Sequence, residues 1–510
     1  MKHGLSRASA WLPWALLLFL GLVSVRAWVV GAGGASPCVI EAMGLGKDLL
    51  SGKENGRQGL VMSLWHPTLP VLVASPLSLL PKGPMRMVLG HGIGLVAGLL
   101  ILRTVFSAAR LSGSGRIVAS LLCFVCLSHP HFLASGLSGE LSLLGYALLA
   151  SAVLQFSLWR GNRRTGHLVS LSIRLSLAQL AAPLAVPFVV FFGLCVLGAL
   201  LREKGRPKGK VEGAMVLFAM PILYGLSLWL LFGWLIMGDP FCAWRNALGG
   251  ASAAGPEKDS LVLDAAAYAW GLLARHPLFV ACLVLGICWP GTRRVALWAG
   301  LLVLFWRAGL FLLGAAWGDA SDAMLLVVFA CLWLGSAVPR RAGQILLAAA
   351  AVLGLFRMGR LAEEPRRVLG EANVALRDGK DILGRARELE SVGEAVERAG
   401  EDGWILVTGY AGYQISEATG SARLIHDMTF QLKKTLSDTS GKPLYLLLPR
   451  PEGEAAASGI YSDYPTLYEK GAPFLLFEEG WENWRLWRVV RSSANPWNVT
   501  VPLEFRTLGE

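Results

Sequence analysis

Long apolar runs separated by short polar segments dominate the first 358 residues of the chain. A run of about 20 apolar residues lets a helix cross the hydrocarbon core of a bilayer, and none of these runs alternates like a barrel strand. We therefore expect about eleven spanning helices. The runs cover residues 10–30, 84–106, 117–133, 141–159, 166–182, 183–201, 213–237, 277–291, 295–316, 322–338 and 342–358.

The first run follows a basic start and has the form of either a signal peptide or a first span. We favour a retained span because everything after it is polytopic. The apolar run 68–80, by contrast, is short and contains Pro70 and Pro76. Such a segment suits an interfacial or re-entrant helix better than a membrane span.

With these assignments, every basic cluster between the predicted spans falls on one side of the membrane. The positive-inside rule makes that side the cytoplasm. The predicted outer segments 31–83, 134–140, 238–276 and 317–321 carry nine acidic residues: Glu41, Asp48, Glu54, Glu140, Asp239, Glu257, Asp259, Asp264 and Asp319. The N-terminus is then cytoplasmic, and an odd number of spans places the chain after residue 358 outside.

The pattern changes after the last span. Residues 359–402 are charged and predict a juxtamembrane helical linker. Residues 403–510 predict a small extracytoplasmic α/β domain, in which short apolar runs form the strands of a parallel or mixed sheet. We expect strands over 404–408, 444–448, 474–477 and 484–490, with a helix over 422–436. The fold class is thus an all-α polytopic membrane domain, residues 1–358, followed by this α/β domain.

Composition and charge support a membrane protein. Hydrophobic residues make up 54% of the chain, charged residues 16%, and the mean hydropathy is +0.52. Residues 1–358 hold 29 Lys/Arg against 12 Asp/Glu, whereas residues 359–510 hold 18 against 23. The basic residues form short clusters between apolar runs, so we interpret them as membrane-loop charge and exclude a nucleic-acid partner.

The first outer segment, residues 31–83, is longer than a simple connection requires and is a candidate functional loop. It contains several ionisable residues, among them Glu41, Asp48 and His66. A carboxylate at the membrane face can act as general base for an acceptor hydroxyl when partial burial raises its pKa. Glu41 is our first candidate for this role, and Asp48 is the reserve.

The order of motifs in this region resembles integral-membrane glycosyltransferases of the GT-C class, including the dolichyl-phosphate-mannose mannosyltransferase-like superfamily. In that class an acidic residue follows the first span, then come a helix ending in an "LL-x-G" turn, a "PPL" segment and an Arg opening the second span. The matching residues are Glu41, Leu49-Leu50-Ser51-Gly52, His66-Pro67-Thr68-Leu69 and Arg86. Glu140 and the run Met237 to Phe241 also look like segments of such enzymes.

The resemblance implies inverting transfer of a hexosyl or pentosyl group from a polyprenyl-phosphate donor to an outer-face acceptor such as a lipid, glycan or protein. It also implies that the loop acid acts as base or orients the acceptor. A phosphate leaving group needs positive charge in a poorly hydrated site. The candidate substrate-binding residues near the predicted outer interface are Arg86, Lys82, His66, Glu140, Arg275 and His276. For Arg86 and Lys82, snorkelling to lipid headgroups is the alternative explanation.

The chain departs from the class in two ways. Many relatives have an "LTRP"-like run where this chain reads Leu180-Ala181-Ala182-Pro183, so that Arg174 is either a displaced substitute or contacts a protein partner. The loop also lacks paired acids, and we name no metal ligand and no certain cofactor. A divalent cation stays an alternative, and Asp319 and Asp322 are paired acids that could bind one. For these two acids we favour helix capping and solvent exposure. The alternative functions are a non-catalytic GT-C-like envelope scaffold and a glycolipid transporter.

Overall fold

The structure is a computed structural model of all 510 residues. It describes residues 37–52, 54–61, 68–81, 84–111, 115–127, 139–141, 143–181, 186–203, 209–242, 379–407, 424–426, 443–451 and 464–490, and the single residues 132, 135, 284, 287, 415 and 461.

The chain divides into two compact units. The first comprises Met1–Arg26, Leu60–Val73 and Leu89–Asn373, and the second comprises Ala27–Gly59, Ala74–Val88 and Val374–Glu510. Part of the first outer segment thus belongs to the same unit as the C-terminal part of the chain. The predicted boundaries at residues 358 and 402 stay predictions.

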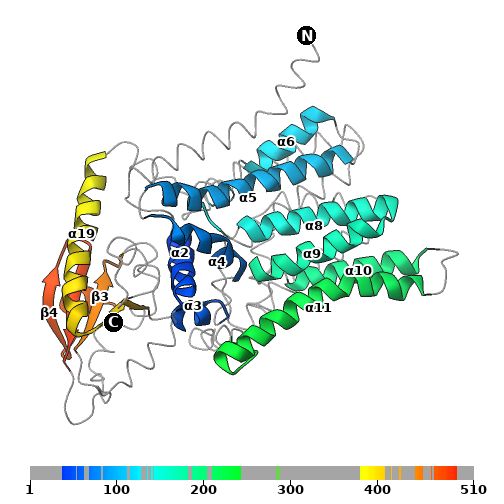
Figure 1. The fold of residues 1–510 in the computed structure, drawn as a ribbon. Coiled ribbons are helices and arrows are strands. Elements are labelled where there is room, and N and C mark those ends of the chain that lie inside the picture. The colour runs from blue at the N-terminus through cyan, green and yellow to red at the C-terminus, as the bar shows by residue number, and fades with distance from the viewer. Residues whose placement is uncertain are drawn as a thin grey trace, which may run out of the picture. The chain divides into compact units, whose positions relative to one another are not determined.

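Six of the predicted spans fall on described helices, drawn from blue to green in Figure 1. Three described segments are long and apolar enough to cross a membrane, namely Val88–Leu111, Leu143–Asn162 and Lys210–Met237. Apart from residues 284 and 287, the other five predicted spans lie outside the described residues, so the number eleven stays a prediction. The six helices are α5 (Pro84–Leu111), α6 (Arg116–Leu127), α8 (Leu143–Asn162), α9 (Thr165–Ala181), α10 (Val186–Leu201) and α11 (Lys210–Met237).

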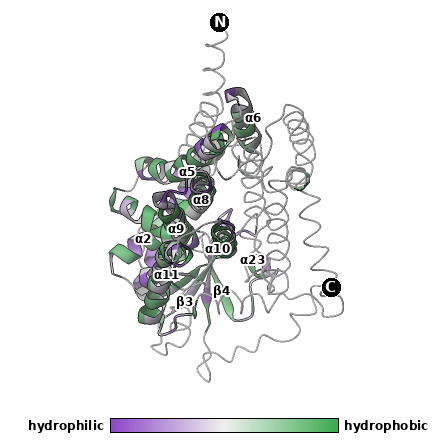
Figure 2. Ribbon diagram, turned by 90° about the vertical axis from the view of Figure 1, so that its right-hand side faces the viewer, coloured by the Kyte–Doolittle hydropathy of each residue, from purple (hydrophilic) through white to green (hydrophobic). Residues whose placement is uncertain are grey.

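These helices are apolar along much of their length, as the green ribbon in Figure 2 shows. Helix α11 is the extreme case, because only 11% of its most apolar 18-residue window is buried inside the protein. Leu223, Phe232 and Leu235 are at least half exposed along it. A helix with apolar residues on several exposed sides is typical of a segment surrounded by lipid.

Helix α9 lies between α8 and α11, and small or hydroxyl residues bring it close to α11. A Cβ atom added at Gly225 of α11 would lie 2.2 Å from the Ser176 hydroxyl oxygen of α9. One turn away, the buried Ser172 hydroxyl donates a hydrogen bond to the Phe218 carbonyl. Close approach through small residues, with hydroxyl groups bonding between helices, is how helices associate in lipid.

Arg174 lies near the middle of α9 and reaches α8, where its guanidinium donates to the Ser151 carbonyl at 3.1 Å. A charged side chain at this depth is costly and normally bonds within the protein. From the sequence, Arg174 is either a displaced substitute for the arginine of the "LTRP"-like run or a residue that contacts a protein partner. The bond to Ser151 agrees with the second explanation.

The run 68–80 forms two short helices, α4 (Thr68–Ala74) and the 3₁₀-helix η2 (Ser75–Leu79). Together they are about 20 Å long, whereas a bilayer core is about 30 Å thick. Pro76 stands at the start of η2, where a missing backbone N–H does no harm. Leu72 and Leu79 are 44% and 73% exposed. The short helix expected here is confirmed, and its exposed apolar residues agree with an interfacial position.

The C-terminal part contains a mixed five-stranded sheet with the order β2-β1-β3-β5-β4. Strand β1 pairs in parallel with β2 and β3, whereas β5 pairs antiparallel with β3 and β4. Four strands coincide with the apolar runs that we expected to form strands. The strands are β1 (Trp404–Val407), β2 (Leu424–His426), β3 (Leu444–Pro449), β4 (Leu475–Gly480) and β5 (Trp484–Val489).

One prediction in this part is wrong. The expected helix over 422–436 contains strand β2, whose Leu424, Ile425 and His426 pair in register with β1. The pairing with the neighbouring strand overrides the helical pattern of this segment. The rest of the predicted helix lies outside the described residues.

Helix α19 (Gly379–Asp402) packs on β1 and on the hairpin formed by β4 and β5. Its Val392 and Val396 are fully buried. Polar contacts reinforce this packing, because Glu388 accepts hydrogen bonds from both the backbone and the side-chain nitrogen of Asn483. The helix expected in the linker is therefore present over these residues, and its stripe of apolar residues faces the sheet.

The close contact between α9 and α11 yields a first prediction. Replacing Gly225 with Ala will lower the stability of the protein by about 1–3 kcal/mol, because the new methyl group overlaps the Ser176 hydroxyl. Thermal unfolding in detergent measures the effect. Adding Ser176→Ala will restore part of the loss, since the Ser176 Cβ is 3.6 Å from the new carbon.

The control is Gly213→Ala, also in α11, where an added Cβ meets nothing within 4 Å. Helix propensity favours Ala over Gly, so Gly213→Ala should keep or raise the stability of the protein. If Gly213→Ala loses as much stability as Gly225→Ala, the interhelical contact does not determine the result.

A second prediction concerns Tyr461, which is buried against the sheet and donates a hydrogen bond to the Pro449 carbonyl. Burial, and then the neighbouring Tyr468, raise the pKa of Tyr461 above its usual value. A raised folded-state pKa means that the stabilisation is complete below about pH 10, the pKa of an unfolded tyrosine, and is lost as the pH rises above it. The sheet will therefore lose its packing above about pH 10.

Near-UV circular dichroism as a function of pH measures this alkaline loss of packing. Tyr461→Phe will cost about 1 kcal/mol at neutral pH and will flatten the alkaline transition. Tyr464→Phe, a half-buried tyrosine of the same segment, should leave the transition in place.

Candidate functional site

The first outer segment folds into a helix, α2 (Pro37–Leu50), that carries both candidate catalytic acids. It ends in the turn that the sequence marks as Leu49-Leu50-Ser51-Gly52. Gly52 has φ +70°, its N–H donates to the Leu49 carbonyl at 3.0 Å, and the Ser51 hydroxyl donates to the Lys47 carbonyl at 2.6 Å. These bonds satisfy carbonyls at the helix end. The expected helix with a terminal "LL-x-G" turn is therefore confirmed.

Two other helices pack on α2 through glycines. A Cβ atom added at Gly46 of α2 would lie 2.7 Å from the Ser75 Cα of η2. In α3 (Glu54–Gly59), a Cβ atom at Gly56 would lie 2.0 Å from the Leu49 backbone nitrogen, and one at Gly59 would lie 2.6 Å from the Leu45 side chain. Without Cβ atoms at these points the backbones approach closely. The segment is thus a packed helical cluster, which we call the loop cluster: α2, α3 and η2.

The two acid positions share one face of α2. Positions 41 and 48 are seven residues apart, which is nearly two full turns. The buried residues Val39, Met43 and Gly46 lie on the opposite face. Position 48 is half-buried. Leu45 lies between the two positions on this face and is buried against α3, so α3 borders the face that carries positions 41 and 48.

Basic groups lie at the C-terminal end of α2. Lys47 is half-buried in the last turn. The guanidinium of the exposed Arg57, on α3, lies 3.8 Å from the place that a Cβ atom would take at Gly52. The end of a helix carries a partial negative charge, which cations stabilise. This accounts for Lys47 and Arg57 without a ligand, so we do not assign them to substrate.

Arg86 lies in the first turn of α5 and belongs to the same compact unit as the loop cluster. Its side chain is 2% exposed, which makes it the largest fully buried side chain of the described part. A snorkelling Arg extends its charged end to the surface. The burial of Arg86 contradicts that alternative and keeps the residue as a candidate anion ligand.

Glu140 lies in a tight turn of the other unit. Gly139 before it has φ +70°, and the Glu140 N–H donates to the Ser135 carbonyl at 2.9 Å. The turn packs directly on α5, since a Cβ atom at Gly94 would lie 2.5 Å from the Gly139 carbonyl carbon. Glu140 itself is half-buried. Its position is therefore set by backbone contact between the turn and a candidate span.

Sequence reasoning missed His91, whose ring packs on this turn. A Cβ atom at Gly139 would lie 2.8 Å from the His91 ring atoms Cγ and Nδ1, and His91 is fully buried. The available signal was the run Gly90-His91-Gly92, an ionisable residue inside an apolar span, where such residues are rare and functional by default.

The remaining candidates His66, Lys82, Arg275 and His276 lie outside the described residues, as do Asp319 and Asp322. The structure therefore groups helix α2 with Arg86 in one unit and Glu140 with His91 in the other. Within the described ranges, no three His, Cys, Asp or Glu residues cluster so as to hold a metal ion.

Comparison with known proteins gives structural neighbours only. No protein-family model matches the chain. No curated protein matches it in sequence.

Two crystal structures of ArnT from Cupriavidus metallidurans are similar to it. The structure bound to undecaprenyl phosphate has a TM-score of 0.49 and 13% identity, covering 95% of this chain and 98% of ArnT. The apo structure has a TM-score of 0.49 and 14% identity, covering 94% and 98%. This likeness is global and weak, so the function proposed below is argued from the chain's own residues.

The glycine contacts of the loop cluster yield a third prediction. Gly56→Ala will separate α3 from α2, because the added methyl group meets backbone atoms of Leu49, which cannot rotate away. Hydrogen–deuterium exchange will become faster over residues 37–59. The matched control, Gly92→Ala, has open space around the added carbon and should leave this exchange unchanged.

Proposed function

We propose that this protein is a membrane glycosyltransferase that moves a sugar from a polyprenyl-phosphate donor to an acceptor at the outer membrane face. The observation that carries the proposal is the loop cluster. A segment next to the predicted first span forms a packed helical platform with two acid positions on one face of α2. The sequence of this segment resembles the corresponding loop of GT-C enzymes.

In the proposed reaction the loop acid receives a proton. The carboxylate of Glu41, or of Asp48 as the reserve, takes the proton of an acceptor hydroxyl. The hydroxyl oxygen forms a bond to the anomeric carbon from the face opposite the donor phosphate. The bond between that carbon and the phosphate oxygen breaks, and the electron pair leaves with polyprenyl phosphate. The product has the inverted configuration. General-base catalysis of this kind contributes about 10²–10⁴ in rate.

The leaving phosphate requires cationic groups. We assign this role to Arg86, with Lys82, His66, Arg275 and His276 as further candidates. The burial of Arg86 supports the assignment, because a buried guanidinium offers strong, directed hydrogen bonds to phosphate oxygens in a site with little water. Glu140 remains a candidate for the acceptor or donor sugar, positioned by Gly139 and His91.

The C-terminal sheet is proposed as an accessory module for the acceptor, since it belongs to the same compact unit as the loop cluster. Trp484 and Trp487 are 5% and 6% exposed and lie in the core of this part, so their role is structural. We propose that this module lies outside the cytoplasm, as the basic clusters predict.

The decisive experiment is turnover of polyprenyl-phosphate sugars by the full-length protein in nanodiscs, followed by mass spectrometry. Glu41→Gln keeps the shape of the side chain and removes the base, so turnover will fall by about 10²–10⁴. Asp48→Asn is the matched variant on the same helix face, and its turnover should fall less than that of Glu41→Gln.

Equal loss of turnover in both variants would mean that neither residue alone is the general base. Full activity of Glu41→Gln with loss in Asp48→Asn would make Asp48 the base. Absence of turnover with every donor and acceptor would favour the alternatives, a non-catalytic envelope scaffold or a glycolipid transporter.

A further inference from the structure

A basic surface lies where four helix ends meet, at the ends of α8 and α10 and the starts of α9 and α11 (Figure 1). The two connections there, residues 160–165 and 201–210, contain eight Lys/Arg and one acid. The positive-inside rule accounts for the sign of this charge but not for its arrangement. The arrangement is specific in three respects.

First, Arg163 adopts a left-handed conformation with φ +56°, which is unfavourable for a residue with a Cβ atom. The guanidinium lies 4.6 Å from the ring centre of Trp159, and its Nη2 donates to the Ala199 carbonyl of α10 at 3.5 Å. Trp159 is 3% exposed. Arg163 therefore ties the turn between α8 and α9 to the end of α10.

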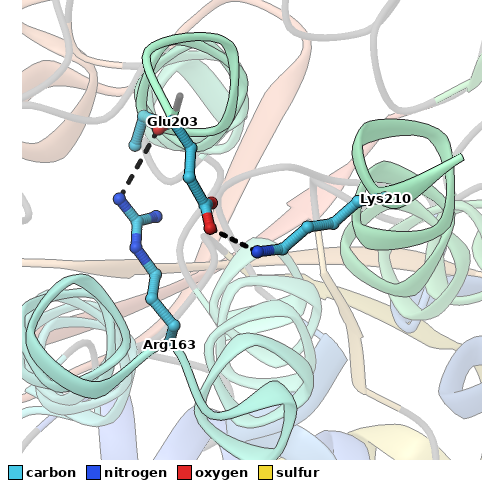
Figure 3. A network of polar contacts seen from close by, with 4 residues as sticks. Arg163, Glu203 and Lys210 are labelled. Atoms are coloured by element: carbon cyan, nitrogen blue, oxygen red, sulfur yellow. Dashed lines mark hydrogen bonds and ion pairs between the residues drawn. The ribbon is translucent and has the colours of Figure 1, made fainter. Parts of the chain in front are cut away.

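Second, Glu203 pairs with Lys210 across the connection between α10 and α11 (Figure 3). The Glu203 N–H also donates to the Leu200 carbonyl at 3.2 Å. This ion pair partners Glu203, whereas Glu212, in the first turn of α11, is an exposed acid of the same helix start.

Third, Arg160, Arg164 and Arg202 are exposed on this surface. The turn that carries Arg164 is fixed, because its N–H donates to the Asn162 side chain at 3.1 Å. Arg160 lies in the last turn of α8. The three exposed arginines thus stand beside the helix ends that Arg163 and the Glu203–Lys210 ion pair connect.

An exposed apolar stripe leads along α10 to these arginines. Val190, Leu194 and Leu201 are 59%, 61% and 52% exposed, and their spacing places them on one face of the helix. A basic group at the end of an apolar stripe matches a molecule with an anionic head and an acyl chain.

We propose that Arg160, Arg164 and Arg202 bind the phosphodiester headgroup of an anionic phospholipid, whose acyl chain lies along the α10 stripe. The planar fork of each guanidinium suits phosphate oxygens. The position at the end of a candidate span corresponds to headgroup level. Basic pockets between membrane helices bind anionic lipids in this way. The stripe favours a lipid over a soluble phosphate. This inference is independent of the proposed function.

The test uses the full-length protein in nanodiscs of phosphatidylcholine with increasing phosphatidylglycerol, and native mass spectrometry measures bound phosphatidylglycerol. In the triple variant Arg160→Gln, Arg164→Gln, Arg202→Gln, affinity will fall on the order of a hundredfold, because each basic residue near an anionic surface contributes roughly a fivefold factor. Arg164→Gln alone will lower the affinity for phosphatidylglycerol about fivefold. This single variant tests the proposal if the triple variant does not fold.

The matched control is Arg103→Gln, Arg110→Gln, Arg116→Gln, which removes three exposed arginines from α5 and α6. Equal loss in this control would overturn the proposal, because any basic cluster would then suffice. Displacement of the lipid by glycerol phosphate would also overturn it and assign the surface to a soluble phosphate. Unchanged affinity in Arg164→Gln and the triple variant would overturn it outright.

Discussion

Close approach of helix backbones is the interaction on which the described structure depends. In lipid, apolar side chains gain little by leaving their surroundings, so helices associate through packing and hydrogen bonds. Gly225 against Ser176, Gly94 against Gly139 and Gly56 against Leu49 are contacts of this kind. Each leaves no room for a Cβ atom. The same device therefore holds α9 against α11, positions the turn before Glu140 and assembles the loop cluster.

Three arginines in or beside the described helices are held within the protein. Arg174 within α9 bonds to a carbonyl of α8, and Arg163 bonds to the end of α10. Arg86 is buried at the start of α5. Because an ion inside or beside a bilayer is costly, each of these residues marks either a structural tie or a ligand site. Arg174 and Arg163 belong to the first class, and Arg86 is our candidate for the second.

The two proposed sites differ in chemistry. The loop cluster offers acid positions on a packed helix, as an acceptor hydroxyl requires. The surface at the ends of α8 and α10 offers arginines and an apolar stripe, which suits binding of an anionic headgroup. A membrane enzyme with a lipid-linked donor needs a site like the loop cluster. The basic surface binds an anionic phospholipid in our proposal.

The sequence by itself determined six of the predicted spans that the structure describes as helices, because the length of an apolar run and the bilayer thickness fix that choice. It also marked the turn at Gly52 and four strands of the sheet. Only the tertiary structure decided the burial of Arg86, the packing of His91 on Gly139 and the pairing of β2 with β1. These features depend on neighbours distant in the chain, and no local pattern encodes which backbone will approach which.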